Sequence, residues 1–292
     1  MTDPDTRRRA IALYDDFTHV HGDRRALMRG MVALAGSAAA AEALIGSIAA
    51  APAAAQIVPA NDPRLLIETA SGSEAGHPLT AYFAAPKAGK GRRGTVIVIH
   101  ENRGLTPHIK DVARRVALAG FNAIAPDFLS PQGGTPADED KAREMIGKAD
   151  YDLVLAQATA TLKRAKAQRG STGKAGAVGF CWGGGLVNRL AVHAGDALDA
   201  GVSYYGPAPA ASEAGKIRAA MLLQLAGNDA RVNGTAIPWG DALRAAGKAA
   251  TTHVYPGVEH AFNNDTSAER YDKAAADLAW SRTVAFLKQR LV

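Results

Sequence analysis

The sequence contains a single cysteine, Cys181, among 292 residues. One cysteine cannot form an internal disulfide, so cysteine usage leaves the cellular compartment open. Aromatic residues make up only 6% of the chain and are not interleaved with a dense basic stripe, which argues against a nucleic-acid partner. The sequence also lacks a P-loop, a dinucleotide fingerprint and any Cys/His run with metal-ligand spacing. We therefore predict no cofactor and no metal.

The composition is that of a folded domain. Hydrophobic residues make up 47% of the chain, enough for a full core, and the length suits one α/β domain. The net charge is +6, and because residues 1–55 hold equal numbers of acidic and basic side chains, the excess lies in the rest of the chain. This positive charge favours anionic substrates.

From residue 64 onward, strand-like and helix-like segments alternate, which predicts an α/β fold with a mostly parallel, doubly wound sheet flanked by helices. We expect strands over 94–100, 121–126, 174–180, 221–226 and 251–255, and helices over 105–119, within 139–168 and over 270–291. The predicted catalytic domain spans residues 56–292.

The cysteine lies in Gly179-Phe180-Cys181-Trp182-Gly183, which fits the pattern Gly-x-nucleophile-x-Gly. A predicted strand precedes it and a predicted helix, over 183–191, follows it. Strand, tight turn and helix are typical of a nucleophile elbow, whose glycines make room for a strained turn. Many lone cysteines are inert, buried hydrophobes, but this setting favours a reactive thiol near a helix N-terminus.

Two downstream residues supply the partners of a triad in the order nucleophile, acid, histidine. Asp229 follows the strand predicted over 221–226, and His260 lies in the loop after the strand over 251–255. An imidazole takes the thiol proton, and an acid behind it orients the ring. Asp229 has an alternative role as a turn or helix-cap residue, and His260 as a surface histidine. His253 is a rival base, but it lies within a strand pattern.

Several motifs resemble the dienelactone hydrolase family of α/β-hydrolases, over roughly residues 60–292. The matching segments are Val96–Leu105, Asp111–Arg115, Ala123–Asp127, Gly179–Gly184, Tyr204–Gly206 and Tyr255–Phe262. The cysteine elbow combined with a glutamate after the strand at 96–100 is the specific part of this resemblance, because a serine elbow alone would indicate only the superfamily.

The resemblance implies a Cys181-His260-Asp229 triad that hydrolyses esters or lactones through a thioester. It also implies that Glu101 interacts with the cysteine and controls when the thiolate forms, although Glu101 has an alternative as a solvated loop acid. The backbone N–H groups of Asn102 and Trp182 would form the oxyanion hole, where each donor contributes about 3–4 kcal/mol.

The substrate is less well defined than the chemistry. Family members that act on dienelactone carry an arginine shortly after the catalytic histidine, whereas this chain has Asn263-Asn264 there and no arginine before Arg270. An asparagine cannot form a charged, bidentate fork with a carboxylate. Arg103, near the expected oxyanion hole, and Tyr205 are the candidate substrate contacts, with a surface arginine as the alternative for Arg103.

The N-terminal segment, residues 1–55, has features of an export signal. Arg24-Arg25 precede an apolar, alanine-rich run over 30–55 that ends in Ala53-Ala54-Ala55, which together predict a Tat signal and a periplasmic or secreted enzyme. Glu42 interrupts the run, which argues against a permanent membrane span. The alternatives are an N-terminal helix pair packed on the catalytic domain and a cytoplasmic enzyme.

We thus expect a carboxylic-ester or lactone hydrolase that acts on a small molecule. The alternatives are a thiol amidase or peptidase of the same fold and a catalytically silent binding protein, although the latter would have no need to keep Cys181, Asp229 and His260. A redox role is disfavoured because no second cysteine can resolve an oxidised one. The oligomeric state is not indicated.

Overall fold

The computed structural model describes residues 3–49, 56–89 and 91–292. Its main part contains an eight-stranded sheet in the order β1-β2-β4-β3-β5-β6-β7-β8. Strand β2 is antiparallel to β1 and β4, and the other neighbouring pairs are parallel. The strands are β1 (Leu65–Glu74), β2 (His77–Pro86), β3 (Arg93–Ile99), β4 (Asn122–Asp127), β5 (Ser171–Phe180), β6 (Ala200–Tyr204), β7 (Ala220–Ala226) and β8 (Ala250–Tyr255).

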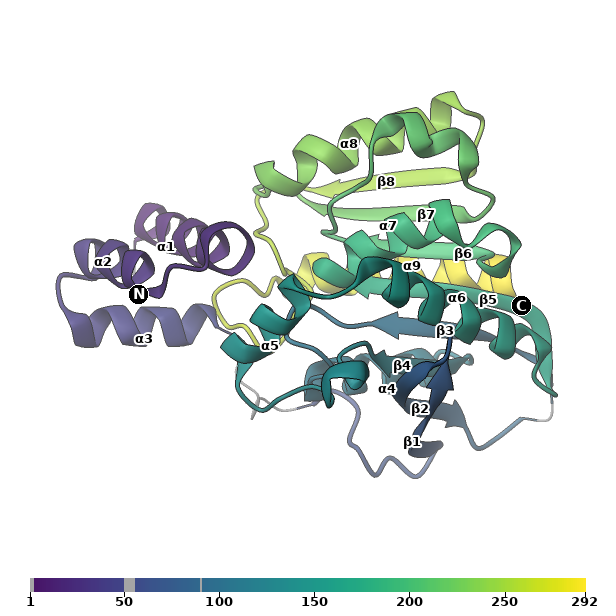
Figure 1. The fold of residues 1–292 in the computed structure, drawn as a ribbon. Coiled ribbons are helices and arrows are strands. Elements are labelled where there is room, and N and C mark those ends of the chain that lie inside the picture. Colours follow the sequence, from purple (N-terminus) through teal and green to yellow (C-terminus); the bar gives the residue numbers. More distant parts are fainter. Residues whose placement is uncertain (1–2, 50–55, 90) are drawn as a thin grey trace.

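Helices cover both faces of this sheet (Figure 1). One face packs against α4 (Pro107–Leu118) and α9 (Lys273–Leu291), and the other against α6 (Tyr151–Ala167), α7 (Trp182–His193) and α8 (Ala230–Ala245). Helix α5 (Glu139–Gly147) precedes α6. Short 3-10 turns lie at 130–132, 195–197 and 211–216.

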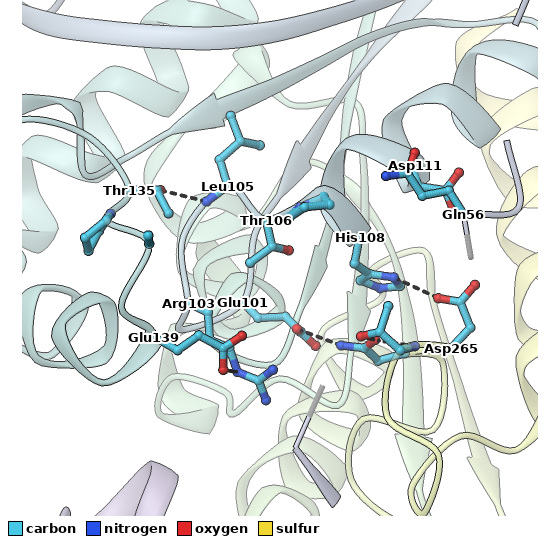
Figure 2. Close-up of a pocket in the computed structure, with 15 residues that line it drawn as sticks. Gln56, Glu101, Arg103, Leu105, Thr106, His108, Asp111, Thr135, Glu139 and Asp265 are labelled. Carbon is cyan, nitrogen blue, oxygen red and sulfur yellow. Dashed lines mark hydrogen bonds and ion pairs between the residues drawn. The ribbon is translucent and has the colours of Figure 1, made fainter. Parts of the chain in front are cut away.

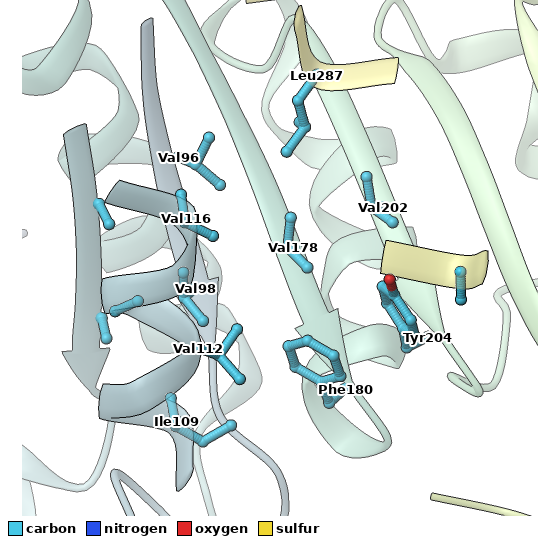
Figure 3. Close-up of a cluster of buried hydrophobic side chains, with 14 of the residues drawn as sticks. Val96, Val98, Ile109, Val112, Val116, Val178, Phe180, Val202, Tyr204 and Leu287 are labelled. Atoms are coloured by element: carbon cyan, nitrogen blue, oxygen red, sulfur yellow. The ribbon is translucent and has the colours of Figure 1, made fainter. Parts of the chain in front are cut away.

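Strands β3, β6 and β7 are mostly apolar and almost entirely buried, because both of their faces are covered. In β3, Val96 and Val98 face α4, while Ile97 and Ile99 belong to the core on the opposite face. Figure 3 shows the first core, where valines from β3, β5 and β6 lie between α4 and Leu287 of α9. This two-sided packing confirms the predicted α/β class and the mostly parallel sheet.

The predicted elements are present with shifts of a few residues at their ends. The closing helix starts at Lys273 rather than 270, because the Asp272 side chain accepts a hydrogen bond from the Ala275 N–H and caps it. The antiparallel β1–β2 hairpin and strand β6 had not been assigned from the sequence.

The N-terminal segment folds into three helices, α1 (Pro4–Asp16), α2 (Arg24–Ala35) and α3 (Ala38–Ile48), with a π-helical turn at Phe17–His21 after α1. They share a small core of their own that includes Ile11, Met31 and Ile48. Figure 1 shows them as a bundle beside the sheet. We call residues 3–49 the N-terminal unit.

The N-terminal unit was also the region of the predicted export signal, and its cleavage motif at 53–55 lies outside the described residues. In the part of the chain that the structure describes, no single helix has the length and apolar character to cross a membrane. Helices α2 and α3 meet those criteria only as a pair, and the pair is bent by 107°.

Candidate active site

The nucleophile lies on a strained turn between β5 and α7. Cys181 has φ 54° and ψ −114°, a conformation that a non-glycine residue adopts only when its surroundings enforce it. A Cβ at Gly179 would lie 2.1 Å from the carbonyl oxygen of Gly183, and a Cβ at Gly183 would lie 2.5 Å from that of His100. Only glycine fits at these two positions, so the Gly-x-Cys-x-Gly pattern reflects backbone contact across the turn.

Asp229 and His260 lie together at the same edge of the sheet, in the loops after β7 and β8. The two residues form a buried pair, with His260 Nδ1 2.5 Å from Asp229 Oδ2. The other oxygen of Asp229 accepts a hydrogen bond of 3.0 Å from the Val232 N–H and caps α8. Asp229 is therefore the helix cap that was one of its two predicted roles, and because a different carboxylate oxygen contacts His260, the cap does not exclude the predicted triad role.

The electrostatic environment favours a charged His260. Burial alone would lower the pKa of His260, but the negative charges of Cys181 and Asp229 outweigh burial and raise this pKa to about 10. Burial also opposes ionisation of Asp229, yet the charge and hydrogen bond of His260 hold the pKa of Asp229 below its usual value. This arrangement suits a thiolate–imidazolium pair oriented by a carboxylate.

A second histidine, His19 of the N-terminal unit, contacts the Cys181 sulfur. His19 Nε2 is 3.1 Å from Cys181 Sγ, and the His19 ring makes an edge contact with the His260 ring at 4.8 Å between centroids. One ring nitrogen of each histidine and the Cys181 sulfur lie within 4.8 Å of one another. Sequence reasoning missed His19, because 162 residues separate it from Cys181 and no motif surrounds it.

Polar contacts hold the N-terminal unit over this edge of the sheet. The Asn102 side chain donates a 3.1 Å hydrogen bond to the carbonyl oxygen of Thr18, next to His19. Further contacts join Arg270 to Asp15 at 3.3 Å, Arg7 to Glu269 at 2.9 Å, Arg24 to Asp140 at 2.6 Å and the Ser267 hydroxyl to the Ile48 carbonyl at 2.6 Å. Together with His19 they leave Cys181 only 4% exposed.

Glu101 follows β3 and is buried rather than a solvated loop acid. Its carboxylate accepts a 3.0 Å hydrogen bond from the Asn264 side chain. Asn264 lies in the segment after His260 where the family that the sequence resembles carries a substrate-binding arginine. In this protein its side chain forms a hydrogen bond with Glu101 instead. A proton-competing role of Glu101 at Cys181 stays a prediction.

A cavity of about 380 Å³ adjoins Glu101. Figure 2 shows Glu101, Arg103, Thr135 and Glu139 around it, with the His108 ring directed to the Asp265 carboxylate. The cavity lining includes Glu101 but not Cys181. The predicted nucleophile therefore does not contact this cavity in the structure.

Of the two predicted substrate contacts, Arg103 lines this cavity and Tyr205 does not. Arg103 is buried rather than on the surface, lines the cavity, and forms a 3.5 Å ion pair with Glu139. The Tyr205 ring makes an edge contact with His260 at 5.0 Å, and the Tyr205 hydroxyl has no hydrogen-bond partner among the described residues. Burial and the nearby charges of Glu101 and Cys181 raise the pKa of Tyr205 well above its usual value, so Tyr205 is neutral.

The two expected oxyanion-hole residues flank the elbow. Trp182 is the first residue of α7, where backbone N–H groups have no partner inside the helix. Asn102 lies in the turn after β3, next to Glu101. The rival base His253 lies within strand β8, and its pKa is lowered by burial and by the charge of Arg282.

Comparison with known proteins assigns the chain to a family. Residues 79–291 match the model of the dienelactone hydrolase family, so the chain belongs to that family. It is 31% identical to the "Putative carboxymethylenebutenolidase" of Escherichia coli K12 over 255 residues, which cover 82% of this chain and 93% of the relative. It is 36% identical to "Protein usf" of Aquifex pyrophilus, covering 72% of this chain and 93% of the relative.

Solved structures agree with this assignment. A Klebsiella pneumoniae structure described as a "Putative Dienelactone Hydrolase" superposes with a TM-score of 0.70 at 31% identity, covering 77% of this chain and 99% of that one. The esterase rPPE, only 14% identical, shares the fold with a TM-score of 0.65 over 100% of this chain and 99% of that one. This protein is therefore a dienelactone hydrolase-like hydrolase. The family match begins at residue 79, so the N-terminal unit lies outside it.

Proposed function

We propose that this protein hydrolyses small carboxylic esters or lactones through a Cys181-His260-Asp229 triad. The observation that carries the proposal is the strained cysteine elbow beside a buried His260–Asp229 pair that favours the charged imidazole. Thiolate and imidazolium are the ground state that a cysteine nucleophile needs.

In the proposed reaction, Cys181 Sγ attacks the carbonyl carbon and the carbonyl oxygen becomes an oxyanion. The N–H groups of Asn102 and Trp182 stabilise this oxyanion. As the C–O bond breaks, His260 gives its Nε2 proton to the leaving alkoxide, which departs as an alcohol, or as the free hydroxyl end of an opened lactone. His260 then takes a proton from water, the hydroxide attacks the thioester, and the acid and Cys181 are released.

The substrate contacts follow from the cavity beside Glu101. About 380 Å³ suits a small ester or lactone, and Arg103 would attract an acidic group of the substrate. Glu139 already neutralises part of the Arg103 charge at 3.5 Å, so this attraction is weaker than that of an unpaired guanidinium. The substrate carbonyl must also replace His19 at the sulfur.

The test is hydrolysis of a panel of small lactones and aryl esters by pure protein, with acid-quenched samples analysed by mass spectrometry for an acyl group on Cys181. We expect turnover and acylation by the wild type. Cys181→Ala should keep the fold, by circular dichroism, and lose several orders of magnitude in kcat/KM. Substantial turnover by Cys181→Ala would contradict the proposal. Amide analogues run in parallel test the amidase alternative, and binding without any turnover would favour a silent binding protein.

We also propose that the chain is exported by the Tat pathway and cut near residue 55. Arg24-Arg25 before the apolar run support this proposal. Cutting there would remove His19 and uncover Cys181. In the structure Arg24 forms an ion pair with Asp140. The export machinery would therefore have to recognise Arg24-Arg25 before the N-terminal unit packs against the hydrolase domain. Mass spectrometry of native protein from the periplasm tests this, and an intact N-terminus would overturn it.

A further inference from the structure

His19, Cys181 and His260 lie close together and can do more than ester hydrolysis requires. Hydrolysis needs one imidazole at the sulfur, whereas this site has two. One ring nitrogen of each histidine and the sulfur lie within 4.8 Å of one another, and His19 Nε2 is 3.1 Å from the sulfur. Three donors around one point are the arrangement of a metal site rather than of a triad.

His19 presents a lone pair toward this point, and His260 does so once a bound metal ion displaces the proton from its Nε2. His19 Nδ1 is 2.9 Å from the backbone carbonyl of Asp15, which can only accept, so Nδ1 carries the hydrogen and Nε2 is free to bind. His260 Nδ1 donates in the same way to Asp229. Metal-binding histidines almost always have their other nitrogen fixed by such an oxygen.

Nε2 of His260 is buried and faces the Cys181 sulfur, whose charge and hydrogen bond contribute to the raised pKa of His260, although the two atoms do not meet strict hydrogen-bond geometry. When Cys181 is a thiolate, the lone pair of His19 faces it with no proton between them. A metal ion would bind all three groups at once.

The donor set selects the ion. A thiolate and two imidazoles suit Zn²⁺, whose bonds of about 2.0–2.1 Å to nitrogen and 2.3 Å to sulfur place tetrahedral donors roughly 3.3–3.6 Å apart. The observed separations, from 3.1 Å to at most 4.8 Å, reach that range through small side-chain rotations.

We propose that His19, Cys181 and His260 form a site for a thiophilic divalent ion such as Zn²⁺, with a fourth position left for water. The ion joins the N-terminal unit to the hydrolase domain and occupies the nucleophile, so the loaded protein is an inactive, oxidation-protected form. The site belongs to the full-length chain and does not depend on the proposed hydrolysis.

The test uses Co²⁺, a spectroscopic substitute for Zn²⁺, on reduced, chelator-treated full-length protein whose intact N-terminus is checked by mass spectrometry. We expect one Co²⁺ per chain, tetrahedral d–d bands and a thiolate-to-cobalt charge-transfer band, all abolished by Zn²⁺. Cys181→Ser should lose the charge-transfer band, and His19→Ala should bind at least ten-fold more weakly. His253→Ala, a histidine outside the cluster, should behave as the wild type.

A second measurement distinguishes a site with three protein ligands from metal binding by the Cys181 thiol alone. Zn²⁺ should slow alkylation of Cys181 by iodoacetamide in the wild type, and much less in His19→Ala, whose fold is checked by circular dichroism. Absence of the charge-transfer band in the wild type, or equal Co²⁺ affinity in His19→Ala, would overturn the proposal. Because neither readout requires an ester, a protein that binds Co²⁺ but hydrolyses nothing would refute the proposed function and leave the metal site standing.

Discussion

Two regions of the chain place a histidine near the same sulfur, and the two rings have opposite protonation. His260, from the loop after β8, has the Asp229 carboxylate behind it, and its pKa is raised to about 10. His19, from the N-terminal unit, has the neutral carbonyl of Asp15 and the neutral hydroxyl of Thr18 behind it, and its pKa is held well below 6.5. A full negative charge behind an imidazole offsets the cost of burying the cation, whereas a carbonyl dipole does not.

This difference separates the roles of the two rings. The charged ring can hold and return a proton, which acid–base catalysis requires. The neutral ring covers the sulfur and can bind a metal, but it has no carboxylate to stabilise an imidazolium during turnover.

The largest expected effect distinguishes the two rings directly. His260→Ala should lose roughly 10³–10⁶-fold in kcat, because the triad acts as a unit. His19→Ala should instead speed alkylation of Cys181 by iodoacetamide several-fold, because the sulfur is uncovered. His253→Ala serves as the matched control for both assays. If His253→Ala lost most of its kcat while His260→Ala stayed active, the catalytic base would be His253, in β8.

Removing the charge behind His260 should be the next largest effect. Asp229→Asn keeps an oxygen for the Val232 cap but removes the carboxylate, so kcat should fall by about 10²–10⁴-fold. Because the charge of Asp229 helps to raise the pKa of His260, we expect the pKa on the alkaline side of the kcat/KM profile to fall in Asp229→Asn. If kcat changed less than three-fold, the acid behind His260 would have no part in catalysis.

The two rings also predict opposite effects of pH on stability. His260 has a folded pKa above its usual 6.5, so its contribution is complete below pH 6.5 and is lost as pH rises through about 10. His19 has a depressed pKa, so its contribution is present above pH 6.5 and is lost as pH falls below 6.5. On acidification, the Tm of the wild type should therefore fall relative to that of His19→Ala. Parallel Tm curves for these two proteins between pH 7.5 and 5 would contradict the depressed pKa.

The smallest expected effect concerns Glu101, whose carboxylate accepts a 3.0 Å hydrogen bond from Asn264. Glu101→Gln removes a charge that disfavours the thiolate, so the pH profile of Cys181 alkylation should shift to lower pH and kcat should fall several-fold. Asn264→Ala, which frees the carboxylate without removing it, is the comparison variant. Identical alkylation profiles and identical kcat in wild type and Glu101→Gln would leave Glu101 with a purely structural role.

Much of the hydrolase domain was predictable because its signals are local. Three signals of this kind are the mostly apolar pattern of β3, the glycines around Cys181 and the turn residues after β7. Each depends on packing within a few residues of its own position. The role of Asn264 as a hydrogen-bond donor to Glu101 was harder to predict. An asparagine shortly after His260 indicates only that a substrate arginine is absent. Its actual contact, with Glu101, spans 163 residues.

By itself, the sequence determined the α/β class, the elbow and the order Cys181, Asp229, His260, because hydrophobic periodicity and turn chemistry act over short stretches of chain. Only the tertiary structure decided that Asp229 caps a helix and orients His260 at once, that Arg103 is buried, and that His19 covers the nucleophile. The reason is that a contact between an N-terminal turn and a central elbow depends on how two separately packed cores dock, and no local pattern in either segment encodes that docking.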